Sequence, residues 1–217
     1  MSATFSPEMD EVTFVVTEHS SFLDSARKRR YEAIRTTLEE IWGRPVRSIH
    51  YPDVERLGPG PVVLSGSGAP WDRHDLAELE RLGDVVRSAE APVLGICAGL
   101  QLLTGFAGGR VEPMAVNGRP PERGYLPLEV LDGSDLLAGL PARATVFQDH
   151  LDEIAELPED FRVLARTAGC EIQAIAAPER RWWGTQFHPE RFDSGHPHGR
   201  RVIANFFELA GRAEPVV

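Results

Sequence analysis

The chain has 217 residues, 42% of them apolar and 26% charged, a composition that is ordinary for one globular domain with its own core. Its net charge of −10 argues against a nucleic-acid partner, because phosphate binding needs a basic face. No leader sequence is visible in residues 1–11, and no apolar run reaches the roughly 20 residues of a membrane helix. Two cysteines, Cys97 and Cys170, are too few for a disulfide framework, so we expect the reducing cytoplasm.

Strands and helices alternate in the first half of the chain. Apolar runs predict strands over residues 12–16, 46–51, 61–64 and 92–96. Apolar residues at helical spacing predict the intervening helices, over residues 25–42, 76–88 and 99–106. The apolar stripe of the second helix comprises Leu76, Leu79, Leu82 and Val86. The second half is richer in strands, expected over residues 125–131, 144–147, 162–166, 172–176 and 182–187, before a closing helix over 202–210.

This alternation predicts the fold class. Strands separated by helices pair in parallel and are covered on both faces. We therefore expect an α/β fold with an open, mostly parallel sheet, helices on both faces and a small antiparallel strand region in the second half. No repeat or interdomain linker is visible, so residues 1–217 are expected to form a single domain.

One cysteine lies between two glycines where an expected strand meets an expected helix, in residues 95–101 (GICAGLQ). A thiol at a helix N-terminus ionises more readily, and functional groups of parallel sheets gather where the strands end. Gly95 and Gly99 allow a tight turn and close packing around it. The Ala98 N–H, at the start of the helix, is free to point at a developing oxyanion. The pattern predicts that Cys97 is a nucleophile.

A histidine and a carboxylate that suit this thiol follow in residues 186–190 (QFHPE). In an extended segment, His188 and Glu190 project from the same side. The carboxylate can then fix the imidazole tautomer and leave the other ring nitrogen for Cys97, as in triads of nucleophile, base and orienting acid. A lone Gly-x-Cys-x-Gly is a weak signal, since buried cysteines are often inert. With Gln101 and the distant histidine in the right order, the catalytic interpretation is the stronger one.

Both motifs resemble the signatures of class I, triad-type glutamine amidotransferases. The similarity covers roughly residues 60–210, and it is greatest to the glutaminase domain of GMP synthetase. That further similarity lies in residues 124–130 (GYLPLEV), 148–154 (QDHLDEI), 157–158 (LP) and 161–165 (FRVLA). The resemblance implies a flavodoxin-like core and a catalytic triad of Cys97, His188 and Glu190.

The same resemblance implies a reaction. Cys97 attacks the side-chain amide of L-glutamine, ammonia leaves, and water hydrolyses the γ-glutamyl thioester. His188 first protonates the ammonia and then activates the water. The ammonia is expected to pass to a separate synthetase subunit. The expected substrate contacts are Gln101, Gly66 and His150, although His150 is equally compatible with a surface position.

The oxyanion hole departs from the family pattern. Relatives commonly carry Gly-Gly-Pro after the third strand, where this chain has residues 65–70 (SGSGAP). Either Ser67 or Gly68 is expected to supply the second N–H, beside that of Ala98. Because of this departure, the sequence does not identify the donor. It also leaves open whether the oxyanion hole forms only when a partner binds.

Other features have plainer interpretations. Cys170 is expected to be structural, and Trp182 and Trp183 to pack on opposite sides of a strand. The histidines of residues 196–198 lie in an expected loop, so no metal site is predicted. The basic run at residues 27–30 is expected to be a solvated helix face, with a docking patch for an acidic partner as the alternative.

No cofactor is implied, since the chain has no Gly-x-x-x-x-Gly-Lys phosphate loop. Two other functions stay open at this stage. One is a hydrolase of γ-glutamyl compounds that uses the same triad without delivering ammonia. The other is a regulatory subunit that kept the fold without the activity. The ammonia acceptor also stays open, between GMP synthesis and a dedicated pathway.

Overall fold

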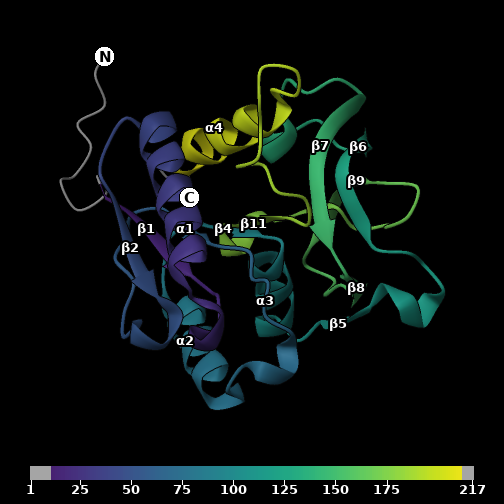
Figure 1. The fold of residues 1–217 in the computed structure, drawn as a ribbon. Helices are drawn as coiled ribbons and strands as arrows, with labels where there is room; N and C mark the ends of the chain where they lie inside the picture. Colours follow the sequence, from purple (N-terminus) through teal and green to yellow (C-terminus); the bar gives the residue numbers. More distant parts are fainter. Residues whose placement is uncertain (1–10, 212–217) are drawn as a thin grey trace.

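The computed structural model describes residues 11–211, which form two sheets and four α-helices (Figure 1). The large sheet has nine strands in the order β2-β1-β3-β4-β11-β10-β9-β6-β7. Its strands are β1 (Val12–Val16), β2 (Val46–His50), β3 (Val62–Leu64), β4 (Val93–Ile96), β6 (Glu122–Val130), β7 (Arg143–His150), β9 (Arg162–Arg166), β10 (Ala174–Ala177) and β11 (Trp182–Thr185). The helices are α1 (Ser25–Trp42), α2 (Leu76–Ser88), α3 (Ala98–Phe106) and α4 (His198–Ala210). Within this part of the chain, no helix is long and apolar enough to cross a membrane.

The sheet is parallel at one end and antiparallel at the other. Strands β2, β1, β3, β4 and β11 run parallel to one another, whereas every pairing from β11 through β10, β9 and β6 to β7 is antiparallel. This arrangement confirms the predicted α/β class, and the antiparallel strands continue the same sheet. A separate pair, β5 (Arg110–Pro113) with β8 (Asp152–Glu156), was not predicted. No residue of β5 is buried. Its short sequence therefore lacks the alternation of apolar and polar residues by which a strand can be predicted.

Two layers of helices cover the sheet. Helices α1 and α4 pack over one face, and α2 and α3 over the other (Figure 1). Trp183 belongs to the first core and Trp182 to the second, as expected of consecutive residues in a strand. Strands β1 and β4 are buried at every position, and accordingly their sequences are mostly apolar and do not alternate with exposed polar residues.

Capping residues set the bounds of the two longest helices of the first half. Asp24 accepts a hydrogen bond from the Arg27 N–H at 2.8 Å, and Gly43 ends α1 in the left-handed conformation with φ of 75°. Asp75 caps α2 through the Ala77 N–H. The apolar stripe predicted for α2 was wrong at one position. Leu76, in the first turn, is 72% exposed, and the buried residues are Leu79, Leu82, Gly83 and Val86.

Candidate active site

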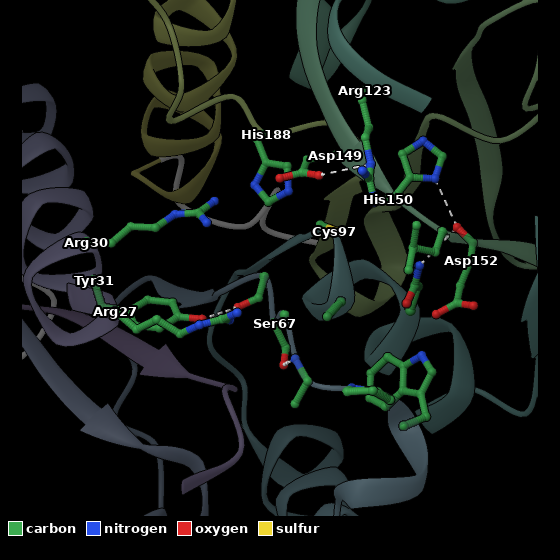
Figure 2. A pocket seen from close by; sticks show the side chains of 18 of the residues that line it. Arg27, Arg30, Tyr31, Ser67, Cys97, Arg123, Asp149, His150, Asp152 and His188 are labelled. Carbon is green, nitrogen blue, oxygen red and sulfur yellow. Dashed lines mark hydrogen bonds and ion pairs between the residues drawn. The ribbon is translucent and has the colours of Figure 1, made fainter. Parts of the chain in front are cut away.

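One cavity of about 580 Å³ lies where the parallel strands end (Figure 2). It is bordered by the turns that follow β3, β4 and β11, as expected for ligand sites of open α/β sheets. The structure brings together at this cavity all nine predicted site residues: Gly66, Ser67, Gly68, Cys97, Ala98, Gln101, His150, His188 and Glu190.

Cys97 forms the turn between β4 and α3. Its backbone is strained, with φ of 52° and ψ of −106°, a conformation that side-chain-bearing residues rarely adopt. The Cys97 N–H donates to the Thr185 carbonyl at 2.7 Å, which ties the turn to β11. The next N–H, that of Ala98, has no acceptor within residues 11–211 and so is available to a ligand.

The glycines beside Cys97 are needed for close packing. A Cβ at Gly95 would lie 2.5 Å from the Gly99 carbonyl oxygen, and a Cβ at Gly99 would lie 2.4 Å from the Leu64 carbonyl oxygen. These contacts are with backbone atoms, which cannot move aside as a flexible side chain can. The predicted close packing is confirmed. The residue with positive φ, however, is Cys97 itself and neither glycine.

We expect Gly99→Ala to lower the free energy of unfolding by about 3 kcal/mol, because the added methyl group overlaps the backbone of β3. Gly105→Ala is the matched control in the same helix. A Cβ at Gly105 meets nothing within 4 Å, so this change should stabilise the protein by up to about 1 kcal/mol. Urea unfolding of both variants measures the difference. Equal stabilities would show that the contact between α3 and β3 relaxes freely.

His188 and Glu190 form a buried pair beside Cys97. The imidazole Nδ1 lies 2.7 Å from Glu190 Oε1, and the two side chains are only 6% and 3% exposed. Burial disfavours the imidazolium, but the charge of Glu190 and the contact with Cys97 outweigh it and raise the pKa of His188 to about 10. Burial likewise opposes ionisation of Glu190, yet His188 holds the pKa of this carboxyl below its usual value.

The turn after β3 packs against both Cys97 and His188. A Cβ at Gly66 would lie 2.9 Å from His188 Cε1 and 3.5 Å from the Cys97 Cβ. Only glycine therefore fits between the turn and the imidazole. A further side chain reaches the thiol: Gln186 Nε2 lies 3.6 Å from Cys97 Sγ. Gln186 was part of the motif that indicated the site, but no contact with the thiol was predicted for it.

The two residues expected as the second oxyanion donor differ in their hydrogen bonding. The Gly68 N–H donates to Glu18 Oε2 at 3.0 Å, so it is already hydrogen-bonded in this conformation. The Ser67 N–H has no acceptor within the part of the chain that the structure describes. Glu18 was not predicted to take part in the site. Its position directly after β1, at the carboxyl end of a parallel strand, was the available signal.

The side of the cavity opposite α1 is lined by polar groups from α3, from the end of β7 and from the start of β8. Gln101 donates through Nε2 to Gln186 Oε1 at 3.0 Å and lies 3.3 Å from the Asp152 carbonyl. His150 is 3% exposed, so the alternative of a surface position was wrong. Its Nδ1 lies 3.0 Å from the Asp152 carbonyl and its Nε2 lies 3.1 Å from Glu122 Oε2. Burial raises the pKa of the Asp152 carboxyl, a lining residue that sequence reasoning missed.

Arginines line the other side of the cavity. Figure 2 shows Arg27 and Arg30 reaching from α1, with Cys97 and His188 between them and the side of Asp152. Arg27 is half-buried, so the expectation of a solvated face was wrong for this residue, whereas residues 28–30 are exposed as expected. Arg27 forms an ion pair with Glu18. The charge of Arg30 helps to hold the pKa of Glu190 low.

The remaining singled-out residues lie apart from the reaction centre. Cys170 is 1% exposed, and burial raises the pKa of its thiol to about 12, which suits the expected structural role. The two histidines of residues 196–198 have separate partners: His196 stacks on Tyr125 with ring centroids 3.7 Å apart, and His198 contacts the Thr145 backbone.

Comparison with known proteins defines the class. The family model described as glutamine amidotransferase class-I matches residues 27–210. The chain belongs to the class I glutamine amidotransferase family, as residues 95–101 and 186–190 predicted.

Particular relatives are glutamine-hydrolyzing GMP synthases or single subunits of them. The GMP synthase subunit from Pyrococcus abyssi is 33% identical over 159 residues, which cover 73% of this chain and 80% of that one. The corresponding subunit from Thermococcus kodakarensis is 38% identical over the same shares of the two chains. The GMP synthase of Syntrophomonas wolfei is 38% identical over 74% of this chain, but that match covers only 30% of the longer protein. A Thermoplasma acidophilum structure, provisionally described as a GMP synthase subunit, has a TM-score of 0.72 at 27% identity, covering 92% of this chain and 94% of that chain.

Proposed function

We propose that this chain hydrolyses L-glutamine to glutamate and ammonia through a γ-glutamyl thioester on Cys97, with His188 and Glu190 completing a triad. One observation carries the proposal. A thiol on a strained strand-to-helix turn shares a cavity with an imidazole that lies 2.7 Å from a buried carboxylate. That is the arrangement of nucleophile, base and orienting acid in acyl transfer.

The reaction then runs in two halves. The Cys97 thiolate attacks the amide carbon, and the negative charge that develops on the amide oxygen is stabilised by the N–H groups of Ala98 and Ser67. His188 protonates the departing ammonia as the thioester forms. The neutral imidazole next takes a proton from water, which attacks the thioester carbon and releases glutamate. Glu190 keeps the ring in one orientation and stabilises its charged form throughout.

We propose that the glutamine substrate binds in this same cavity. Gln101, Gly66 and His150 line it, in keeping with the contacts expected from the sequence. We add Asp152 to this set. Its carboxylate borders the cavity, and burial has partly stripped it of water, so a cationic partner would be favoured there. The α-ammonium group of glutamine is such a partner.

The ammonia is proposed to reach a separate synthetase. Two relatives are each described as one subunit of a GMP synthase, and the longer Syntrophomonas wolfei protein contains a region like this chain within a larger protein. GMP formation is therefore the favoured acceptor reaction. We also propose a single domain over residues 1–217, because residues 11–211 share one large sheet and its two helical layers. Both cysteines are free, which suits the expected reducing cytoplasm.

An assay of glutamate release tests the proposal. The purified chain is given L-glutamine or a γ-glutamyl anilide, with and without the synthetase that co-purifies from native cells. We expect a higher kcat/KM for glutamine than for the anilide, and GMP formation from glutamine when the synthetase is present. A preference for the anilide with no effect of the synthetase would support the γ-glutamyl hydrolase instead. No turnover and no thioester under either condition would support a regulatory subunit.

A further inference from the structure

A fully buried carboxylate holds the turn that follows β3. The Glu18 side chain is 0% exposed and lies directly after β1. Its Oε1 accepts hydrogen bonds from Ser67 Oγ at 2.9 Å and from the Ala69 N–H at 3.0 Å. Its Oε2 accepts the Gly68 N–H at 3.0 Å. Three consecutive residues of the turn therefore donate to a single carboxylate.

Helix α1 completes the network from the other side. Arg27 and the Tyr31 hydroxyl, at 3.2 Å, also donate to Glu18 Oε2. The same hydroxyl lies 3.0 Å from the Gly66 carbonyl oxygen, on the near side of the turn. The turn is thus bonded on both sides of Ser67, while the Ser67 N–H itself has no acceptor within residues 11–211.

We propose that Glu18 is a positioning residue of the active site, whose carboxylate turns the Gly68 N–H away from Cys97 and leaves the Ser67 N–H facing the reaction centre. The inference rests on the proposed glutaminase function, and it identifies what presets the second oxyanion donor. Glu18 reaches the chemistry only through the turn, since neither Cys97 nor His188 is among its hydrogen-bond partners.

The network requires an ionised carboxylate. Burial by itself would raise the pKa of Glu18, yet the hydrogen bonds from Gly68 and Ser67, with the charge of Arg27, hold it below its usual value. An amide could not replace it. Glutamine has one acceptor oxygen, so its NH₂ group would face either the Gly68 N–H or the Ala69 N–H. Two donors cannot bond to each other, and the turn would have to move.

The test compares Glu18→Gln with the wild type in glutamine hydrolysis and in alkylation of Cys97 by iodoacetamide. Alkylation displaces iodide from a saturated carbon and forms no oxyanion, so it reports the thiolate alone. We expect kcat to fall by about 10- to 100-fold, less than for outright removal of an oxyanion donor, with KM within about two-fold. The alkylation rate should stay unchanged. Glu18→Asp, which keeps the charge, should recover part of kcat.

Glu153→Gln is the matched control. Glu153 is another buried carboxylate, 3% exposed and bonded to Arg119 and Asn117, but it does not line the cavity. Its loss should lower stability and leave kcat unchanged. If Glu18→Gln does not fold, Ser67→Ala still tests the idea. It deletes one donor to Glu18 and keeps the Ser67 N–H, and it should lower kcat by about three-fold without changing the alkylation rate.

Three results would overturn the inference. The first is an unchanged kcat in both Glu18→Gln and Ser67→Ala. The second is an equal fall in kcat and alkylation, which would make Glu18 a purely structural residue. The third is a kcat in Glu153→Gln that falls as far as in Glu18→Gln. Failure of the proposed function looks different: the wild type itself then hydrolyses no glutamine, alone or with its synthetase.

Discussion

Cys97→Ala is expected to lower kcat for glutamine hydrolysis by at least about 10⁵-fold, to the limit of detection. Without the sulfur no thioester can form, and the remaining groups can only assist direct attack by water. The variant should still fold, since Ala keeps the Cβ and loses one atom from a turn whose N–H remains bonded to Thr185. Glutamate release gives the rate. Mass spectrometry of acid-quenched protein should detect the γ-glutamyl adduct in the wild type alone.

Cys170→Ala supplies the control for this experiment. Its thiol is as buried as a core side chain, and burial raises its pKa to about 12, so it carries almost no thiolate at neutral pH. The variant should retain wild-type kcat and form the adduct. An adduct that persists in Cys97→Ala and disappears in Cys170→Ala would refute the assignment of the nucleophile.

Glu190→Gln is expected to lower kcat by about 10³- to 10⁴-fold. The amide is nearly the same shape, but it cannot neutralise the imidazolium and it permits the wrong tautomer of His188. The change should also move the alkaline limb of the kcat profile. The pKa of His188 is raised to about 10 partly by Glu190, so without that charge His188 loses its proton at lower pH. Because protonation of ammonia needs the imidazolium, activity should then decline at lower pH than in the wild type.

The measurement is kcat of the wild type and of Glu190→Gln between about pH 6 and pH 10.5. This range spans both the ordinary pKa of histidine and the raised pKa of His188. Glu153→Gln again serves as the control, since it removes a buried carboxylate from outside the cavity. An alkaline limb that stays in place in Glu190→Gln, with kcat within about ten-fold of wild type, would mean that another group orients His188.

Local sequence signals predicted most of the fold. The bounds of α1 and α2 follow from capping residues that lie next to the helices, Asp24, Gly43 and Asp75, so short windows of sequence contain them. The buried strands β1 and β4 are mostly apolar runs, which the sequence shows directly. The strand β5 has no buried position, and it forms only because β8 pairs with it. Such a pairing cannot be predicted from the sequence of either segment alone.

The site divides in the same way. Cys97, His188 and Glu190 were predicted because their motifs are local and each residue type has a recognisable chemical use. Glu18 could not be identified from the sequence in this way. Its partners in the turn after β3 lie about 50 residues further along the chain. Two of them are backbone N–H groups, which almost any residue type can supply. The choice of Ser67 over Gly68 as the proposed second oxyanion donor depended on the Glu18 carboxylate, which accepts the Gly68 N–H. It therefore needed the three-dimensional structure.

The strand order has a consequence for how the enzyme is made. Strand β11, which leads to His188 and Glu190, is synthesised well after β4, which leads to Cys97, yet the two strands pair in parallel. Such long-range parallel contacts form late in folding. A growing chain can therefore carry its thiol long before it gains its base. The proposed release of ammonia therefore has to wait until the chain as far as Glu190 has been made and β11 has paired with β4.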